Sequence, residues 1–294
     1  MMMTRTDKAF GRQRGVTLIE MIVAIVVTGI LVSLTSMFVR NQIESYGDVA
    51  RRVDLVDMAD GAVRRMARDL QNALPNSPRT PGSNCVEFIP TKTGGRYRTD
   101  SDGSAGSEYL DFTAADSKFN MYGPMSSNAA QQIAVGDLVS VYNLGITGAN
   151  AFEGDNTSAV VSPAPNYSAT SKETTINIAS KLFPLASATS RFHVIPGAEQ
   201  AVSYVCLGAG VSAAGDGQGT LYRLVKTLPY PAPASCPASV PAGTPVIASN
   251  IGSCVFSYTP GTLQRTGLVS IALEIRRAGE PVAIHQQVNV TNTP

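Results

Sequence analysis

The sequence predicts an α+β protein in which a long N-terminal α-helix precedes a C-terminal globular domain rich in antiparallel β-strands. Residues 21–39 form an apolar run without a charge, and a helical pattern of apolar residues continues to residue 74. Beyond Pro75 the pattern changes to short β-type segments separated by turn residues. Because the second half of the helix carries an apolar stripe, we expect that half to pack on the β-rich domain.

The chain is expected to have four parts. Residues 1–15 form a basic leader, residues 16–39 a transmembrane or filament-core helix, residues 40–74 an amphipathic stalk helix, and residues 75–294 the β-rich globular domain. With 294 residues and 44% hydrophobic content, the chain is long enough to bury a sizeable core.

The formal net charge of the chain is +1, which gives no general basic field for nucleic acid, so we expect no nucleic-acid partner. The charge is unevenly placed. Residues 1–15 contain Arg5, Lys8, Arg12 and Arg14 against Asp7, a balance of +3 that leaves −2 for the remainder. Basic residues before an apolar span predict a cytoplasmic N-terminus and a globular domain on the other side of the membrane.

The run from Met21 to Val39 has 19 residues, which as a helix spans roughly 30 Å, the thickness of one hydrocarbon core. A cleaved secretory signal has a shorter apolar region that ends at a small-x-small site. Residues 33–40 offer no convincing site of that kind. The run therefore predicts a single membrane-spanning helix in contact with lipid.

Glu20 is the unusual residue of this segment, since the apolar helix is expected to begin at Val16 and thus carries a carboxylate near its head. An unpaired carboxylate in lipid costs on the order of a few kcal/mol. If the chain is cut after Gly15, the new α-amine of Val16 lies four residues before Glu20 on the same helix face. Glu20 also complements the helix dipole, and in a bundle it would pair with a neighbour's amine and set the register.

These residues resemble the prepilin-peptidase signal of type IV pilins and type II secretion pseudopilins, in which a short basic leader ends in glycine before a T-L-x-E sequence and an apolar run. The matching residues are Gly15, Val16, Thr17, Leu18 and Glu20. Val16 replaces the usual phenylalanine. Met37 stands where major subunits often have a helix-kinking proline, which favours a minor subunit.

The resemblance implies a structural subunit and not an enzyme. A prepilin peptidase would cut after Gly15 and methylate the amine of Val16. The precursor would sit in the bacterial inner membrane as a single-pass protein with a periplasmic C-terminal domain. An inner-membrane assembly platform would then move it into a pilus or pseudopilus, where the N-terminal helix, with Glu20 at its head, contacts other major and minor pilins.

The stalk is predicted by apolar residues at helical spacing, with charged residues on the other faces. The pairs Asp60/Arg64 and Arg65/Asp69 lie four residues apart and are expected to attract each other. Acids interspersed with the basic residues of 64–68 favour a solvated stalk face over a nucleic-acid patch. The apolar stripe consists of Ile43, Val49, Val53, Val56, Val63, Met66, Leu70 and Leu74.

The globular domain is predicted to contain short strands. Residues 149–170 and 229–245 are expected to be long surface loops, and residues 277–281 a hairpin connection. The predicted strands are Cys85–Ile89, Tyr109–Phe112, Leu138–Tyr142, Thr174–Ile178, Phe192–Ile195, Ala201–Leu207, Thr220–Val225, Cys254–Tyr258, Leu268–Arg276 and Val282–Val290.

Several segments of the mature chain resemble MshO-type minor pilins of the mannose-sensitive haemagglutinin (MSHA) pilus, which are related to J-type pseudopilins. By that resemblance the protein would join a small complex of minor subunits that starts or caps the filament. An alternative function is a pilus-tip adhesin or a substrate-docking binding module, which the long loops permit. The segments are residues 50–52, 64–77, 202–206, 220–223 and 285–294.

The four cysteines are Cys85, Cys206, Cys236 and Cys254, and none stands in a C-x-x-C sequence. An even number without metal spacing predicts disulfides in an oxidising compartment. Three connectivities are possible. Pairing Cys236 with Cys254 would close a short interval and leave Cys85 for Cys206, and we take this pairing as the working hypothesis.

No cofactor, metal site or catalytic residue is expected. The segment 99–108 is similar to a calcium loop but lacks the acidic spacing, and the glycines of 208–219 are followed by no helix that would bind phosphate. His193 and His285 lie on predicted strands without a nearby Cys or His partner, so we interpret them as structural residues with satisfied hydrogen bonds.

Overall fold

A computed structural model describes residues 15–103, 106–261 and 265–291, and it does not describe the side chains of residues 40–45. The leader residues 1–14 and the side chain of Ile43 therefore lie outside the described residues. The chain divides at Val53 into two compact units, residues 1–53 and residues 54–294. Each unit is considered by itself.

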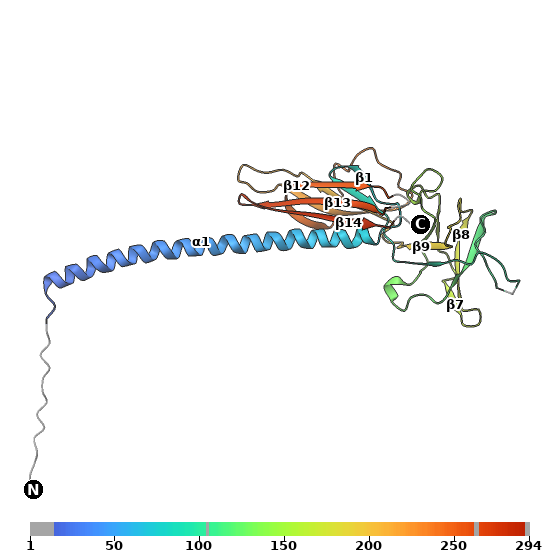
Figure 1. Cartoon of the computed structure of the whole chain (residues 1–294), viewed down its shortest axis with the longest axis horizontal. Coiled ribbons are helices and arrows are strands. Elements are labelled where there is room, and N and C mark those ends of the chain that lie inside the picture. The colour runs from blue at the N-terminus through green and yellow to red at the C-terminus, as the bar shows by residue number, and fades with distance from the viewer. Residues whose placement is uncertain (1–14, 104–105, 262–264, 292–294) are drawn as a thin grey trace, which may run out of the picture. The chain divides into compact units, whose positions relative to one another are not determined.

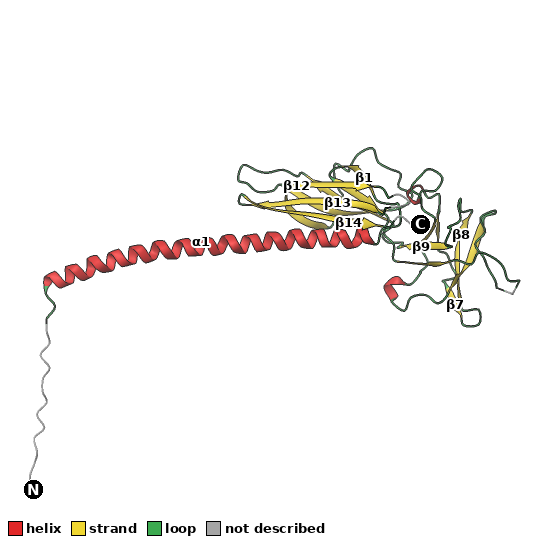
Figure 2. Cartoon of the chain, in the orientation of Figure 1, coloured by secondary structure: helices red, strands yellow, loops and turns green. Residues whose placement is uncertain are grey.

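The helix α1 extends from Leu18 to Gln71 (Figures 1 and 2). It begins at Leu18 and not at Val16, because Thr17 caps its first turn. It ends before the expected Leu74, where the Asn72 side chain donates to the Arg68 carbonyl oxygen at 3.1 Å. Pro75 prevents any continuation.

The main sheet of the globular unit is antiparallel throughout, in the strand order β1-β2-β10-β11-β12-β13-β14. One face of this sheet covers the C-terminal part of α1, and the two enclose the main core. The predicted α+β class, with a long apolar helix before an antiparallel β-rich domain, is confirmed. The strands are β1 (Arg79–Gly82), β2 (Cys85–Phe88), β10 (Ala201–Leu207), β11 (Gly219–Lys226), β12 (Val246–Thr259), β13 (Gly267–Arg277) and β14 (Glu280–Val290).

Residues 89–200, between the neighbouring strands β2 and β10, form two smaller antiparallel sheets with the orders β3-β9-β5-β6 and β4-β8-β7. These sheets share a core of their own, in which Phe119 lies edge-on to Phe192 at 5.3 Å between ring centroids. The strands are β3 (Thr93–Arg96), β4 (Asp116–Tyr122), β5 (Leu138–Val141), β6 (Thr157–Ala159), β7 (Asn166–Ser168), β8 (Glu173–Lys181) and β9 (Arg191–Ile195), with the 3-10 turns η1 (Ala129–Gln131) and η2 (Ala151–Glu153).

Most predicted strands are confirmed, with boundaries that differ by a few residues except in β12, which begins at Val246 and not at the predicted Cys254. The strand predicted at Tyr109–Phe112 is wrong, since that segment is irregular and the strand begins further on, at Asp116. Residues 149–170, predicted as a loop, contain η2 and the short strands β6 and β7. Residues 229–245 are irregular, as predicted.

The predicted stripe is confirmed in its C-terminal half, where Val63, Met66, Leu70 and Leu74 are buried, but not in its N-terminal half. Val49, Val53 and Val56 are 60%, 53% and 40% exposed. Small residues were missed as core members, since Ala59 and Ala62 are buried and allow the sheet to approach the helix closely. The residues of α1 that enter the core are Leu55, Ala59, Ala62, Val63, Met66 and Leu70.

The ion pair expected between Arg65 and Asp69 is also wrong. Asp69 instead contacts Arg223 of β11, at 3.1 Å between Oδ2 and Nε, and accepts a hydrogen bond of 2.8 Å from the hydroxyl of Tyr204. The expected pair Asp60/Arg64 is confirmed at 2.6 Å. Asp69 therefore links the end of α1 to the sheet.

All four cysteines form disulfides, but the working pairing is wrong. The bonds are Cys85–Cys236 and Cys206–Cys254. Cys85 lies directly opposite Val205 in the β2–β10 ladder, so its side chain shares a face with Val205. Cys206, the next residue along, points to the other face, and a Cys85–Cys206 bond is therefore excluded.

The β13–β14 hairpin predicted at residues 277–281 is confirmed. Arg277 lies opposite Glu280, and the two residues between them have positive φ, 51° at Ala278 and 81° at Gly279. Positive φ at both central residues is the geometry of a type I′ turn, whose twist matches that of the flanking strands.

Candidate functional site at the N-terminal helix

Gly15, Val16 and Thr17 form a non-helical segment immediately before α1. Gly15 is exposed, and a Cβ added to it would meet no atom within 4 Å. The peptide bond between Gly15 and Val16 therefore lies in an exposed, non-helical stretch of chain. Such a stretch can enter a protease active site without unfolding of any regular element.

Thr17 caps the helix, which the sequence analysis did not anticipate. The backbone N–H of Glu20 donates to Thr17 Oγ1 at 3.4 Å, and the N–H of Met21 donates to the Thr17 carbonyl oxygen at 3.2 Å. A threonine followed three residues later by glutamate is the pattern of a capping box. The T-x-x-E spacing was the signal that was available for this role.

Glu20 lies in the first turn of α1, as expected, so its carboxylate complements the N-terminal end of the helix dipole. The predicted helix start at Val16 is wrong, because Val16 precedes the helix, and the alignment of its amine with Glu20 after cleavage stays a prediction. A hydrogen-bonded cap at Thr17 sets the helix start there. Val16 and Thr17 are thus two exposed, non-helical residues ahead of the helix.

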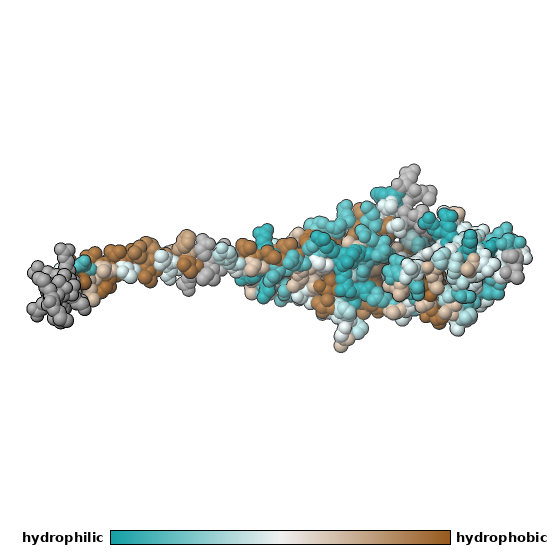
Figure 3. All heavy atoms as spheres, turned by 90° about the horizontal axis from the view of Figure 1, so that it is seen from below, coloured by the Kyte–Doolittle hydropathy of each residue, from teal (hydrophilic) through white to brown (hydrophobic). Residues whose placement is uncertain are grey.

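The part of α1 from Leu18 to Val39 has a mean hydropathy of 2.5 and no residue buried within the protein. By length and composition it is the one helix among the described residues that is able to cross a membrane. Figure 3 shows apolar residues on the visible face of this part of the helix. Thr35 keeps its hydroxyl satisfied inside the helix, since Oγ1 donates to the Leu31 carbonyl oxygen at 2.8 Å.

Residues 11–36 match the family model described as the prokaryotic N-terminal methylation motif. Comparisons with curated proteins and with solved structures found no match. The matched residues include Gly15, Val16, Glu20 and most of the exposed apolar span. The match supports a prepilin-like protein of the type IV pilin or pseudopilin class, and the single N-terminal apolar helix fits a single-pass membrane anchor.

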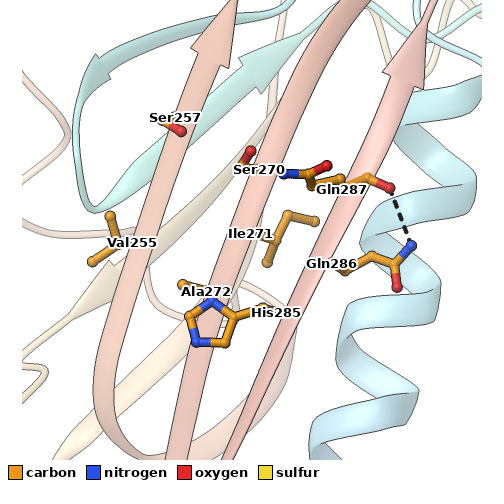
Figure 4. A pocket seen from close by; sticks show the side chains of 8 residues that line it. All are labelled: Val255, Ser257, Ser270, Ile271, Ala272, His285, Gln286 and Gln287. Carbon is orange, nitrogen blue, oxygen red and sulfur yellow. Dashed lines mark hydrogen bonds between the residues drawn. The ribbon is translucent and has the colours of Figure 1, made fainter.

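His285, interpreted from the sequence as a structural residue, is exposed. It lies exposed on the outer face of the main sheet, in a row with Val255 and Ala272, and Ser257, Ser270 and Gln287 form the next row (Figure 4). These residues line an open, shallow pocket of about 500 Å³. In the described ranges no group of three or more His, Cys, Asp and Glu side chains is placed to hold a metal ion.

Two of the three acids in the segment similar to a calcium loop are paired with basic side chains. Asp102 contacts Arg98 at 3.1 Å, and Glu108 contacts Lys118 at 2.6 Å. The glycine-rich segment 208–219 connects β10 to β11 and approaches other backbone closely, since a Cβ on Gly217 would lie 2.0 Å from the Asn250 carbonyl oxygen. The glycines there serve chain packing.

Proposed function

We propose that the protein is a minor pilin or pseudopilin, a structural subunit of a type IV pilus or of a type II secretion-like filament, and not an enzyme. The observation that carries the proposal is the exposed apolar helix from Leu18, headed by Glu20 and preceded by an uncovered Gly15–Val16 bond. A helix with no covering inside its own chain requires lipid or other helices around it.

In this proposal a prepilin peptidase cuts after Gly15 and methylates Val16 at the inner membrane. The basic leader stays in the cytoplasm, and the globular domain lies in the periplasm, where both disulfides form. The inner-membrane assembly platform then transfers the subunit to the filament. There α1 exchanges lipid for the helices of other pilins, and Glu20 pairs with a neighbouring amine.

A minor role, as in the MshO-type pilins, is supported by the absence of proline between Leu18 and Gln71. Proline kinks a helix, and an unkinked helix departs from the pattern of major subunits. We place the subunit in a tip or initiation complex.

The experiment is processing of a Gly15→Ala variant in cells that express the peptidase. We expect the wild-type protein to begin at a methylated Val16 by mass spectrometry, and the variant to keep its leader. Gly47→Ala is the matched control, because Gly47 is also exposed with no atom near an added Cβ. Normal cleavage of the Gly15 variant, or an intact leader on the wild-type protein, would contradict the proposal.

A second function is favoured by the insertion of residues 89–200, whose two sheets and separate core are not needed to cover α1. An inserted unit of this kind suits a tip adhesin or a docking module for a secreted protein. Exchanging residues 91–198 for a short glycine-serine linker keeps Glu199, the partner of Arg223, and is expected to abolish binding while assembly continues. Loss of assembly would assign the insertion to the filament instead.

A further inference from the structure

The edge of the four-stranded sheet carries an unusual pair of cations. Arg96 of β3 lies directly opposite Arg191 of β9, so the two side chains stand on the same face. Like charges at directly opposed positions of an antiparallel pair destabilise the sheet. Within the described residues neither guanidinium makes a hydrogen bond or an ion pair with an acid.

Three well-covered arginines of the globular unit are each paired with an acid. Arg79 contacts Glu87 at 2.8 Å, Arg98 contacts Glu173 at 2.9 Å, and Arg223 contacts Glu199 at 2.8 Å. Arg96 and Arg191 are exposed and face each other instead of an acid. Two like charges placed directly opposite each other need a reason other than stability of the sheet.

The two arginines line a pocket of about 370 Å³ together with His193. His193 lies two residues along β9 from Arg191 and therefore faces the same side of the sheet. Gly94 lies directly opposite His193, so no side chain fills the space between the histidine and the sheet edge. A Cβ at Gly94 would lie 2.6 Å from the Phe192 carbonyl oxygen, which excludes larger residues there.

His193 also has an unsatisfied polar atom. Its Nε2 is buried and has no hydrogen-bond partner among the described residues. Ser140 of β5 lies on the opposite flank of His193, and its Oγ is likewise buried without a described partner. Burial and the charge of Arg191 lower the pKa of His193, and a negative charge in the pocket would act in the opposite direction by favouring the protonated ring.

We propose that Arg96, Arg191 and His193 form a binding site for an oxyanion group, a carboxylate or a phosphate, at the edge of the β3–β9 ladder. Guanidinium groups bind both anions through paired N–H donors, and a ligand of charge −1 or −2 relieves the repulsion between the two arginines. β3 is an edge strand, so an anionic group on a large partner reaches the site without opening the sheet. The site does not depend on the proposed assembly function.

The test uses the full chain in a non-ionic detergent, with histidine labelled by ¹⁵N. The protein has two histidines, so the imidazole signals of His193 and His285 report on the site and on a remote control in one spectrum. Sodium phosphate and sodium acetate are titrated separately, each against sodium chloride at equal ionic strength. We expect a saturable shift of the His193 signal alone, and the probe that saturates at the lower concentration identifies the preferred anion.

Arg96→Gln and Arg191→Gln are each expected to weaken the apparent affinity at least tenfold. Arg277→Gln removes the same charge from an exposed position at the far end of β13 and is expected to change nothing. An unshifted His285 signal shows that a variant is folded. The site is rejected if His193 responds no differently to phosphate or acetate than to chloride, if both histidines shift alike, or if Arg277→Gln weakens binding as much as the other variants.

Discussion

Asp69 and Arg223, which are 154 residues apart in the sequence, meet at 3.1 Å where the end of α1 contacts the main sheet. Arg223 also holds both carboxylate oxygens of Glu199, at 3.0 and 2.8 Å. Tyr204 donates its hydroxyl to Asp69 at 2.8 Å, and burial together with the Asp69 charge raises the pKa of that hydroxyl. Arg223 of β11 thus joins the C-terminal end of α1 to the turn that precedes β10.

Replacing Arg223 by methionine should lower the free energy of unfolding by about 1–3 kcal/mol, because Asp69 would lose its charged partner inside a partly buried network. Chemical denaturation followed by circular dichroism measures the change. Arg64→Met breaks the exposed Asp60–Arg64 pair and should leave the midpoint almost unchanged. Equal effects of the two substitutions would show that the network does not stabilise the fold.

Glu199 gives the network a pH dependence. The hydrogen bonds from Arg223 lower the pKa of Glu199 below its ordinary value of 4.5. A carboxyl group with a lowered pKa in the folded state contributes stability above pH 4.5 and loses that contribution as the pH falls further. We expect Glu199→Gln to have a lower free energy of unfolding than the wild type at pH 7. Between pH 5 and 3 the variant should lose less of that free energy, because it lacks the one carboxyl group that takes up a proton. An unchanged acid slope would contradict this.

The disulfide pairing is testable by peptide mapping of the non-reduced protein. We expect cross-linked peptides that contain Cys85 with Cys236 and Cys206 with Cys254. The first bond spans 151 residues, so in the loop-entropy model its removal in a Cys85→Ser/Cys236→Ser variant costs up to about 5 kcal/mol. The Cys206→Ser/Cys254→Ser variant, with a span of 48 residues, should lose up to about 4 kcal/mol plus the packing of two buried sulfurs. A Cys85–Cys206 peptide would invalidate the sheet register described for β2 and β10.

Glu20→Gln should leave cleavage after Gly15 intact and reduce incorporation into filaments, because the amide carries no charge for a neighbouring amine. Glu20→Asp keeps the charge on a shorter side chain and should retain part of the incorporation. Immunoblots of sheared filaments against membranes measure the ratio. If the Gln variant is incorporated like the wild type, the charge of Glu20 has no role in assembly.

Thr17→Ala should loosen the first turn of α1, since the N–H of Glu20 loses its acceptor, whereas Thr17→Ser keeps the hydroxyl. Hydrogen exchange at Glu20 and Met21 in detergent should be faster by roughly fivefold for the alanine variant, equivalent to about 1 kcal/mol. Equal exchange in both variants would mean that the cap is not formed.

Local patterns were sufficient for the long helix and for the long strands β13 and β14. Strand β13 alternates along its whole length, so one face is buried and the period is visible in the sequence. Strand β4 begins with polar residues, and part of its support comes from Asn120, whose side chain bonds to Glu173 at 2.8 Å. Glu173 is brought to Asn120 by the tertiary structure, so the periodicity of the sequence could not predict the contact.

The contacts that were predicted wrongly also depend on tertiary structure that local patterns do not show. Arg65 lies four residues before Asp69, so the local spacing predicted that pair. Asp69 instead contacts Arg223, which the sheet brings from a distant part of the chain. The facing of Cys85 and Cys206 depends on a one-residue register between β2 and β10. The Arg96–Arg191 pair depends on the register of β3 and β9 in the same way. The sequence shows that these residues are present, but the pairing of the strands determines which of them face each other.

The insertion leaves the main sheet after Phe88 and returns at Val202, and these two residues are directly paired. Because both ends of the excursion lie side by side, a change of length within it does not by itself separate β2 from β10. The main sheet would sense an exchange at the contacts that the region makes outside itself, such as that of Glu199 with Arg223. Variation is therefore least constrained in the part of residues 89–200 that lies away from those contacts.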